Sequence, residues 1–231
     1  TGPQGEKGDD GASTDSHAHS FASNTVVGES VMDPEAGSAN TVVGYAAGLS
    51  TSTGTDNVFL GAHAGSMTTG QSGYNTIAGS YAFSSGTRGT NNTCLGWGAG
   101  KVFGGDAAVL VGMSAGLNST TAPEMTAVGT GALEMNEESV GNTALGYYAL
   151  HRHNPSIDAA GQTAVGAHAL ELCSMGLENT AVGMSALRNL SIGRNNTALG
   201  FEAGLGVTEG YGNVAIGYRA LAEDMAGSYN L

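Results

Sequence analysis

From residue 24 onward the chain repeats one short pattern of polar and apolar positions. Residues 179–183, Asn-Thr-Ala-Val-Gly, show the pattern: a polar residue, a β-branched residue, an apolar residue, an aliphatic residue and a glycine. β-Branched and aliphatic residues between a turn-forming Asn and a Gly are typical of a short strand. The glycines that close the copies are Gly28, Gly44, Gly61, Gly79, Gly96, Gly112, Gly129, Gly146, Gly166, Gly183, Gly200 and Gly217.

These glycines are 16 to 20 residues apart, and most gaps are 17 residues. This period is too short for ankyrin, tetratricopeptide or leucine-rich repeats, which need longer elements. It accommodates two short strands and two turns, which together make one rung of a β-solenoid. We therefore predict an all-β fold, a parallel β-solenoid or β-roll of about twelve 17-residue rungs over residues 24–231, with neighbouring rungs about 4.8 Å apart.

At four positions of the repeat, one residue or one class of residue occurs in most or all of the twelve copies. Asn stands four places before the glycine in nine of the twelve copies, with Ala108, Met125 and Gln162 as exceptions. The next position is Thr in nine copies and Val in three, and the residue before the glycine is always aliphatic. Ala stands three places after the glycine in eleven copies. Stacking would place the Asn side chains above one another, so we expect them to hydrogen-bond along the stack.

The repeated alanine predicts assembly of several chains. The residues expected to face inward are small, so a single rung is expected to be too thin to enclose its own core. A line of alanines then indicates close approach to a neighbouring backbone. We expect three solenoids to pack side by side and bury these faces on one another.

Residues 1–13 predict three chains independently. Glycine occupies every third position from Gly2 to Gly11, with Pro3 after the first glycine. This spacing is what three polyproline-II strands need to meet on a common axis. We predict a collagen-like stalk end at residues 1–13, a linker at 14–23 and the repeat fibre domain at 24–231, in a homotrimer.

Composition and charge exclude several classes of function. The chain has 39 glycines in 231 residues, only 12% charged residues and a net charge of −13. An acidic chain with seven Lys and Arg residues cannot neutralise nucleic-acid phosphates or dock on an anionic membrane. There is no run of 18 apolar residues, so membrane insertion is not expected in this segment. The chain begins without Met, and we expect it to be part of a longer protein.

Residues 142–150 and 179–187, Asn-Thr-Ala-Leu/Val-Gly-x-x-Ala-Leu, resemble the head repeats of YadA-like trimeric autotransporter adhesins. They also resemble repeats in phage and giant-virus fibre proteins that carry collagen-like stalks. The resemblance implies a left-handed, trimeric β-roll that is extracellular, on a virion fibre or a cell-surface appendage, and serves attachment. The 17-residue period departs from the shorter unit of the autotransporter heads, which leaves open whether each chain forms its own roll or three chains intertwine.

Catalytic motifs give little support to an enzyme. The chain has no Walker loop and no His-Glu-x-x-His motif, and its acidic residues are scattered. We therefore expect no enzyme and no required cofactor, and predict a structural and adhesive segment of a trimeric surface fibre. Two alternatives remain: an ice- or surface-binding solenoid, since a Thr line on a flat β-face can order water, and a purely structural fibre spacer.

His17 and His19 form a candidate metal site. In an extended segment, residues two apart point to the same side. Three parallel chains would bring six imidazoles to the axis, enough for one transition-metal ion per trimer. The alternative is a solvated polar linker.

The receptor site is expected where the repeat varies. The two places after each glycine vary most, and they include Trp97, Tyr147, Tyr148 and Tyr218. The longest gap adds an insertion that begins with His151, Arg152 and His153. Aromatic rings beside polar groups can bind a carbohydrate or a cell-surface receptor, whereas the alternative is that the aromatics cover a groove between chains.

The two cysteines are not expected to form a disulfide. Cys94 occupies the strand position equivalent to Val26 and is expected to pack as a small apolar residue. Cys173 falls in a turn four rungs later, about 19 Å away at the rung spacing, which exceeds the reach of a disulfide.

Overall fold

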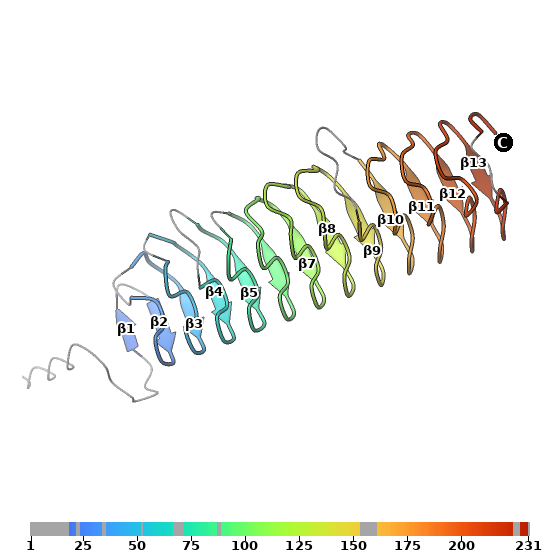
Figure 1. Ribbon diagram of the computed structural model, residues 1–231. Coiled ribbons are helices and arrows are strands. Elements are labelled where there is room, and N and C mark those ends of the chain that lie inside the picture. The colour runs from blue at the N-terminus through green and yellow to red at the C-terminus, as the bar shows by residue number, and fades with distance from the viewer. Residues whose placement is uncertain are drawn as a thin grey trace, which may run out of the picture.

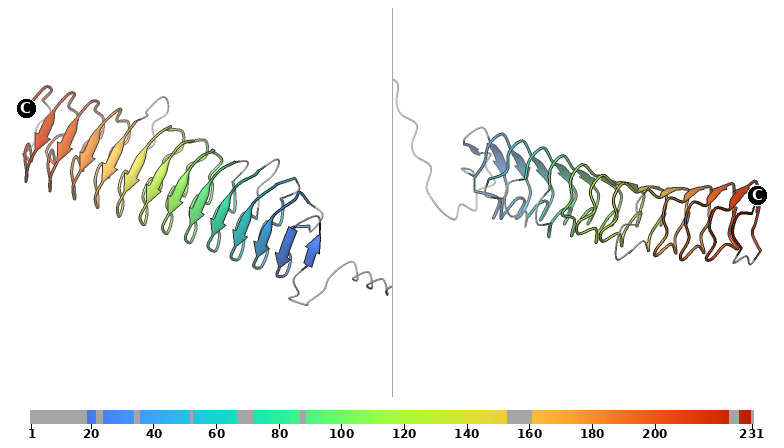
Figure 2. Two further views of the ribbon diagram at one scale, coloured as in Figure 1. Left: turned by 180° about the vertical axis from the view of Figure 1, so that it is seen from behind. Right: turned by 90° about the horizontal axis from the view of Figure 1, so that it is seen from above.

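The computed structural model describes residues 19–21, 24–33, 36–51, 53–66, 72–86, 89–152, 161–223 and 227–230. The predicted collagen-like end at 1–13 lies outside these residues. The chain forms one elongated solenoid in which short strands stack side by side along the long axis (Figure 1, Figure 2). The strands are β1 (His19–Phe21), β2 (Asn24–Val27), β3 (Thr41–Val43), β4 (Val58–Leu60), β5 (Thr76–Ala78), β6 (Thr93–Leu95), β7 (Val109–Val111), β8 (Thr126–Val128), β9 (Thr143–Leu145), β10 (Thr163–Val165), β11 (Thr180–Val182), β12 (Thr197–Leu199) and β13 (Val214–Ile216).

The twelve strands β2 to β13 make one parallel sheet in sequence order. Equivalent residues pair between neighbours, so that Thr163 lies beside Thr180 and Ala164 beside Ala181. At the N-terminal edge β1 pairs with β2 antiparallel. These features confirm the predicted all-β parallel solenoid with 17-residue spacing. The prediction of a second strand in each rung is wrong: residues 147–150 form a turn, so each rung contributes a single strand.

Burial alternates within each three-residue strand. The first and third side chains face outward, and the middle one is buried, as the pattern of β12 shows for Thr197, Ala198 and Leu199. This is the two-residue period of a strand with one face on the core. The buried middle positions are Val26, Val42, Phe59, Ile77, Cys94, Leu110, Ala127, Ala144, Ala164, Ala181, Ala198 and Ala215.

The alanine three places after each glycine is buried inside its own chain, and this corrects the sequence-based argument for assembly. Ten of the eleven alanines are fully buried in the same core as the strand interiors, and Ala220 is partly buried against it. The turn after each glycine brings larger side chains, such as Leu150, Leu170 and Phe83, over the inner face of the sheet, where they are fully buried. A rung this narrow needs small residues opposite the large ones. The alanines therefore need no second chain to cover them.

The Asn residues form the predicted ladder. The nine repeat asparagines are fully or almost fully buried, and most bond to the equivalent Asn one rung away, with Asn57 Nδ2 donating to Asn40 Oδ1 at 3.0 Å. The ladder runs over Asn24, Asn40, Asn57, Asn75 and Asn92, and again over Asn179, Asn196, Asn213 and Asn230. Gln162 continues it, since its Oε1 accepts from the backbone N–H of Asn179 at 3.1 Å.

The ladder is interrupted at Ala108 and Met125, and a neighbouring side chain repairs the gap. Asn142 would donate to the ladder residue of the preceding rung, but Met125 has no amide to accept it. Asn136 is buried in that rung, and its Oδ1 accepts from Asn142 Nδ2 at 3.2 Å. Asn136 Nδ2 in turn donates to the Ser139 carbonyl at 3.1 Å. The side-chain amides of Asn136 and Asn142 therefore stay hydrogen-bonded across the interruption.

Neither cysteine forms a disulfide, both are fully buried, and Cys94 lies at the strand position predicted for it. Burial raises the pKa of each thiol to about 12, so both stay protonated at neutral pH. Among the described residues there is no helix with the length and apolar character needed to cross a membrane.

Candidate functional site

Four aromatic rings gather on the surface at rungs β9 and β10. Tyr147 and Tyr148 lie 4.3 Å apart between ring centroids, and Tyr148 lies 4.5 Å from His151. His168, from the next rung, meets the edge of Tyr147 at 5.3 Å and lies 6.1 Å from Tyr148. We call Tyr147, Tyr148, His151 and His168 the aromatic cluster. The structure thus brings together three predicted receptor-binding residues and adds a fourth.

Backbone geometry holds the two tyrosines in place. Tyr147 follows Gly146 directly and points outward, with 48% of its surface exposed. Tyr148 adopts the left-handed conformation at φ 51°, and its N–H donates to the Thr130 carbonyl at 2.9 Å. Its ring covers Gly131, where a Cβ would collide with the ring. The glycine one rung away therefore provides the space that the Tyr148 ring occupies.

Charged side chains border the cluster. Glu171 Oε2 accepts from Arg188 Nε at 2.6 Å and lies 3.0 Å from His168 Nδ1. On the other side, Glu134 Oε2 lies 3.5 Å from His151 Nδ1. The Glu171 side chain is only 14% exposed, so its contacts with Arg188 and His168 are partly shielded from water. These groups orient the two imidazoles against the tyrosine rings.

The cluster also affects the tyrosine hydroxyls. The pKa of Tyr148 is raised, first by its hydrogen bond to Tyr147 and then by the charge of Tyr147, with smaller contributions from burial and from Glu134 and Glu171. The Tyr148 phenol therefore stays neutral at physiological pH, and its hydroxyl can donate and accept hydrogen bonds. Flat rings beside such polar groups can bind a sugar through stacking and hydrogen bonds.

The remaining receptor-binding predictions fall elsewhere. Trp97 and Tyr218 occupy the same repeat position as Tyr147, and they are 51% and 74% exposed. They lie three and four rungs away, about 14 and 19 Å at the rung spacing, so the structure does not join them to the cluster. Tyr218 instead stacks on Phe201 at 5.5 Å. Arg152 is exposed, and His153 lies outside the described residues.

The predicted metal ligands are His17 and His19. His17 lies outside the described residues, and His19 begins β1. Over the part of the chain that is described, no group of three or more His, Cys, Asp and Glu residues could hold a metal ion. The six-imidazole site at His17 and His19 stays a prediction.

One segment has the spacing of a nucleophile elbow. Residues 112–116, Gly-Met-Ser-Ala-Gly, match Gly-x-Ser-x-Gly, and Ser114 has a positive φ of 58°. A nucleophile elbow leads from a strand into a helix, whereas these residues follow β7 into a turn. The equivalent positions of the adjacent rungs are Gly98 and Gly131, which supply no base. The match therefore reflects the glycine repeat.

Sequence reasoning missed His168, Glu134, Glu171 and Arg188. Comparison of equivalent positions in successive copies of the repeat would have found three of them. Glu134, His151, Glu171 and Arg188 all stand five places after their glycines, in four consecutive rungs. Parallel in-register stacking places such residues above one another, and acidic and basic residue types alternate in the order of the contacts observed.

The outward face of the sheet is the second candidate surface. Its first line of side chains, the Thr ladder, is the residue three places before each repeat glycine: Thr25, Thr41, Val58, Thr76, Thr93, Val109, Thr126, Thr143, Thr163, Thr180, Thr197 and Val214. Its second line, the aliphatic ladder, is the residue before each glycine: Val27, Val43, Leu60, Ala78, Leu95, Val111, Val128, Leu145, Val165, Val182, Leu199 and Ile216. All twelve aliphatic residues are partly or largely exposed, up to 64% at Ile216. The face is therefore flat, periodic and half apolar along the whole solenoid.

A scan of protein-family models, a search of curated proteins and a search of solved structures each gave no match.

Proposed function

We propose that the chain is a structural and adhesive segment of a homotrimeric surface fibre, extracellular on a virion or a cell-surface appendage, which attaches to a glycan or other receptor. The observation that carries this proposal is the exposed aliphatic ladder. Large contiguous apolar surfaces are uncommon on monomers and mark interaction sites. Twelve aliphatic side chains in line, over about 53 Å at the rung spacing, make such a surface.

A second and third copy of the chain fit this surface best. A partner must offer apolar groups at the same spacing and over the same length, and another copy does so by construction. The collagen-like triplets at residues 1–13 favour three parallel chains. The aliphatic ladder thus replaces the buried alanines as the basis for the trimer. The left-handed turn implied by the resemblance, and three separate rolls rather than intertwined chains, complete the proposed fibre.

The proposed trimer predicts a mass in solution and predicts that charged substitutions in the aliphatic ladder dissociate it. Light scattering should give about 69 kDa, three times the 22.9 kDa chain. Replacing Val128 and Leu145 with Lys places charges in the apolar contact, and we expect a folded species of monomer mass. Both side chains are exposed in the single chain, so its own core is unaffected.

The matched control replaces Thr120 and Thr121 with Lys, which adds the same charge in an exposed turn outside the sheet. This variant should stay trimeric. A monomeric wild-type chain, or a trimer that survives the two substitutions in the aliphatic ladder, would contradict the proposed interface.

The aromatic cluster is the proposed attachment site. Replacing Tyr147 and Tyr148 with Ala should reduce binding on a glycan array or to receptor-bearing cells at least tenfold, because both rings leave the site. The melting temperature should change by only a few degrees, since both rings lie at the surface. Trimer symmetry would present three such sites and raise the avidity of weak single contacts.

The control for the cluster is Tyr45→Ala, which removes a tyrosine at the same repeat position as Tyr147 but six rungs away. Binding by this variant should match the wild type. Full binding by the Tyr147 and Tyr148 variant would place attachment outside the cluster, whereas absence of binding by the wild-type chain would favour a purely structural spacer.

Ice or surface binding is the second candidate, favoured by the Thr ladder. Nine Thr side chains stand in line on the exposed face of a single sheet. This face is the one that the trimer would cover, so the two functions compete for it. A chain that stays monomeric in light scattering and shows thermal hysteresis would favour this candidate over the fibre.

A further inference from the structure

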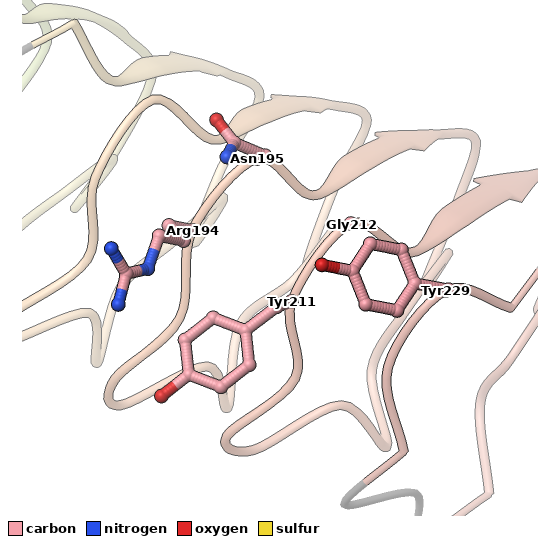
Figure 3. A pocket seen from close by; sticks show the side chains of 5 residues that line it. All are labelled: Arg194, Asn195, Tyr211, Gly212 and Tyr229. Atoms are coloured by element: carbon pink, nitrogen blue, oxygen red, sulfur yellow. The ribbon is translucent and has the colours of Figure 1, made fainter.

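A hollow lies on the turns that precede β12 and β13, away from the aromatic cluster. It has a volume of about 360 Å³ and is lined by Arg194, Asn195, Tyr211, Gly212 and Tyr229 (Figure 3). These residues belong to three consecutive rungs, two places and one place before the ladder residues Asn196, Asn213 and Asn230. The size is within the range of small-ligand sites.

Backbone hydrogen bonds fix the positions of the lining residues. Arg194 and Tyr211 form a parallel bridge, and the Gly212 N–H donates to the Arg194 carbonyl at 3.0 Å. The Tyr229 N–H donates to the Tyr211 carbonyl at 2.8 Å. The hollow is therefore built on the same stacked scaffold as the core, and its side chains start from defined points.

Gly212 keeps the hollow open. A Cβ at this position would lie 2.9 Å from two carbons of the Tyr229 ring, so the ring sits directly against the glycine. Figure 3 shows the Tyr229 hydroxyl directed toward the Arg194 side of the hollow. Tyr211 is 39% exposed, which leaves ring surface available to a ligand.

Arg194 supplies the positive charge. Its guanidinium lies 5.2 Å from the centre of the Tyr211 ring, a cation–π distance that holds the side chain over the hollow. Arg188 and Arg219 each pair with a glutamate, whereas Arg194 has no ion pair among the described residues. In a chain with a net charge of −13, such a guanidinium is a distinctive feature.

We propose that this hollow binds a saccharide that carries a carboxylate, a uronic acid residue of an acidic polysaccharide. The guanidinium fork matches a carboxylate in a bidentate pair. The tyrosine faces accept the apolar face of the sugar ring, and the Asn195 amide and the Tyr229 hydroxyl can hydrogen-bond to its hydroxyls. This site is separate from the aromatic cluster and does not depend on trimer formation.

Two exposed acidic residues limit how much negative charge the ligand can carry. Glu178 occupies the position of Asn195 one rung earlier, and Glu209 lies two residues before Tyr211. Their charges oppose a densely anionic chain, so the site favours a single carboxylate placed at Arg194. Binding should weaken as salt is raised, because exposed charges are screened.

The test is calorimetric titration of the full chain with a galacturonic acid tetrasaccharide, its carboxyl-reduced counterpart and a sulfated galactose tetrasaccharide. We expect binding of the uronate alone. Arg194→Gln should weaken it at least tenfold by removing the charge while keeping a long polar side chain. Arg219→Gln, an exposed arginine outside the hollow, should bind like the wild type.

A second variant fills the hollow. Gly212→Asn should abolish binding while the chain stays folded, because Asn195 occupies the equivalent position at φ 59° in the preceding rung. Absence of uronate binding, equal binding of the carboxyl-reduced sugar, or unchanged affinity in Arg194→Gln would overturn the proposal. Preference for the sulfated sugar would also overturn it, in favour of a sulfate ligand. Light scattering on the same samples reports the trimer separately, so the two proposals fail independently.

Discussion

Gly166→Ala is expected to destabilise the solenoid by about 4 kcal/mol or more, at the upper end of single substitutions. Gly166 adopts φ +129°, and an added Cβ would lie 2.6 Å from the carbonyl carbon and oxygen of Gly183 in the next rung. Those atoms are backbone, and the N–H of Gly183 donates to the Val165 carbonyl beside them. Relief of the clash therefore requires the two rungs to separate. Urea unfolding followed by circular dichroism measures the loss.

Gly217→Ala is the matched control. Gly217 holds the same repeat position at φ +119°, but a Cβ there meets no atom within 4 Å. The substitution brings the backbone strain without the inter-rung clash, and we expect a cost of about 1–2 kcal/mol. Equal losses in the two variants would show that strain at positive φ, and not close stacking, explains the repeated glycine.

Asn196→Ala is expected to cost about 4 kcal/mol. The Asn196 side chain donates to Asn179 Oδ1 at 2.9 Å and to the Gly210 carbonyl at 2.8 Å. It also accepts from the N–H and the side-chain amide of Asn213, at 2.9 and 3.0 Å. Truncation removes these bonds and leaves buried groups of the neighbouring rungs unsatisfied, at about 1–3 kcal/mol each. Urea unfolding followed by circular dichroism measures this loss in the free energy of unfolding.

Asn118→Ala serves as the control for the ladder, since Asn118 is a half-buried residue in a turn outside the ladder. Its substitution should change the free energy of unfolding by no more than about 0.5 kcal/mol. A small loss in Asn196→Ala would mean that water replaces the ladder bonds, and that the buried asparagines contribute register and not stability.

The repeat by itself determined the strands and their stacking. A β-branched residue, an apolar residue and an aliphatic residue between Asn and Gly predicted each strand, as at 180–182, and the structure places a strand there. The Asn ladder followed from the same period, because in-register stacking puts identical side chains next to each other. Both conclusions depend on local sequence and on the repeat length.

Tertiary structure alone decided which repeated positions face the core. Ala149 and Leu145 are both apolar and both repeated, yet Ala149 is buried and Leu145 is 37% exposed. The turn that folds Ala149 beneath the sheet passes through positive φ at Tyr148 and Leu150, a conformation that residue type does not predict for Tyr or Leu. The aromatic cluster depends on the same turn. The path of the backbone, and not the hydrophobicity of a residue, separates the interior of this solenoid from the face that it offers to a partner.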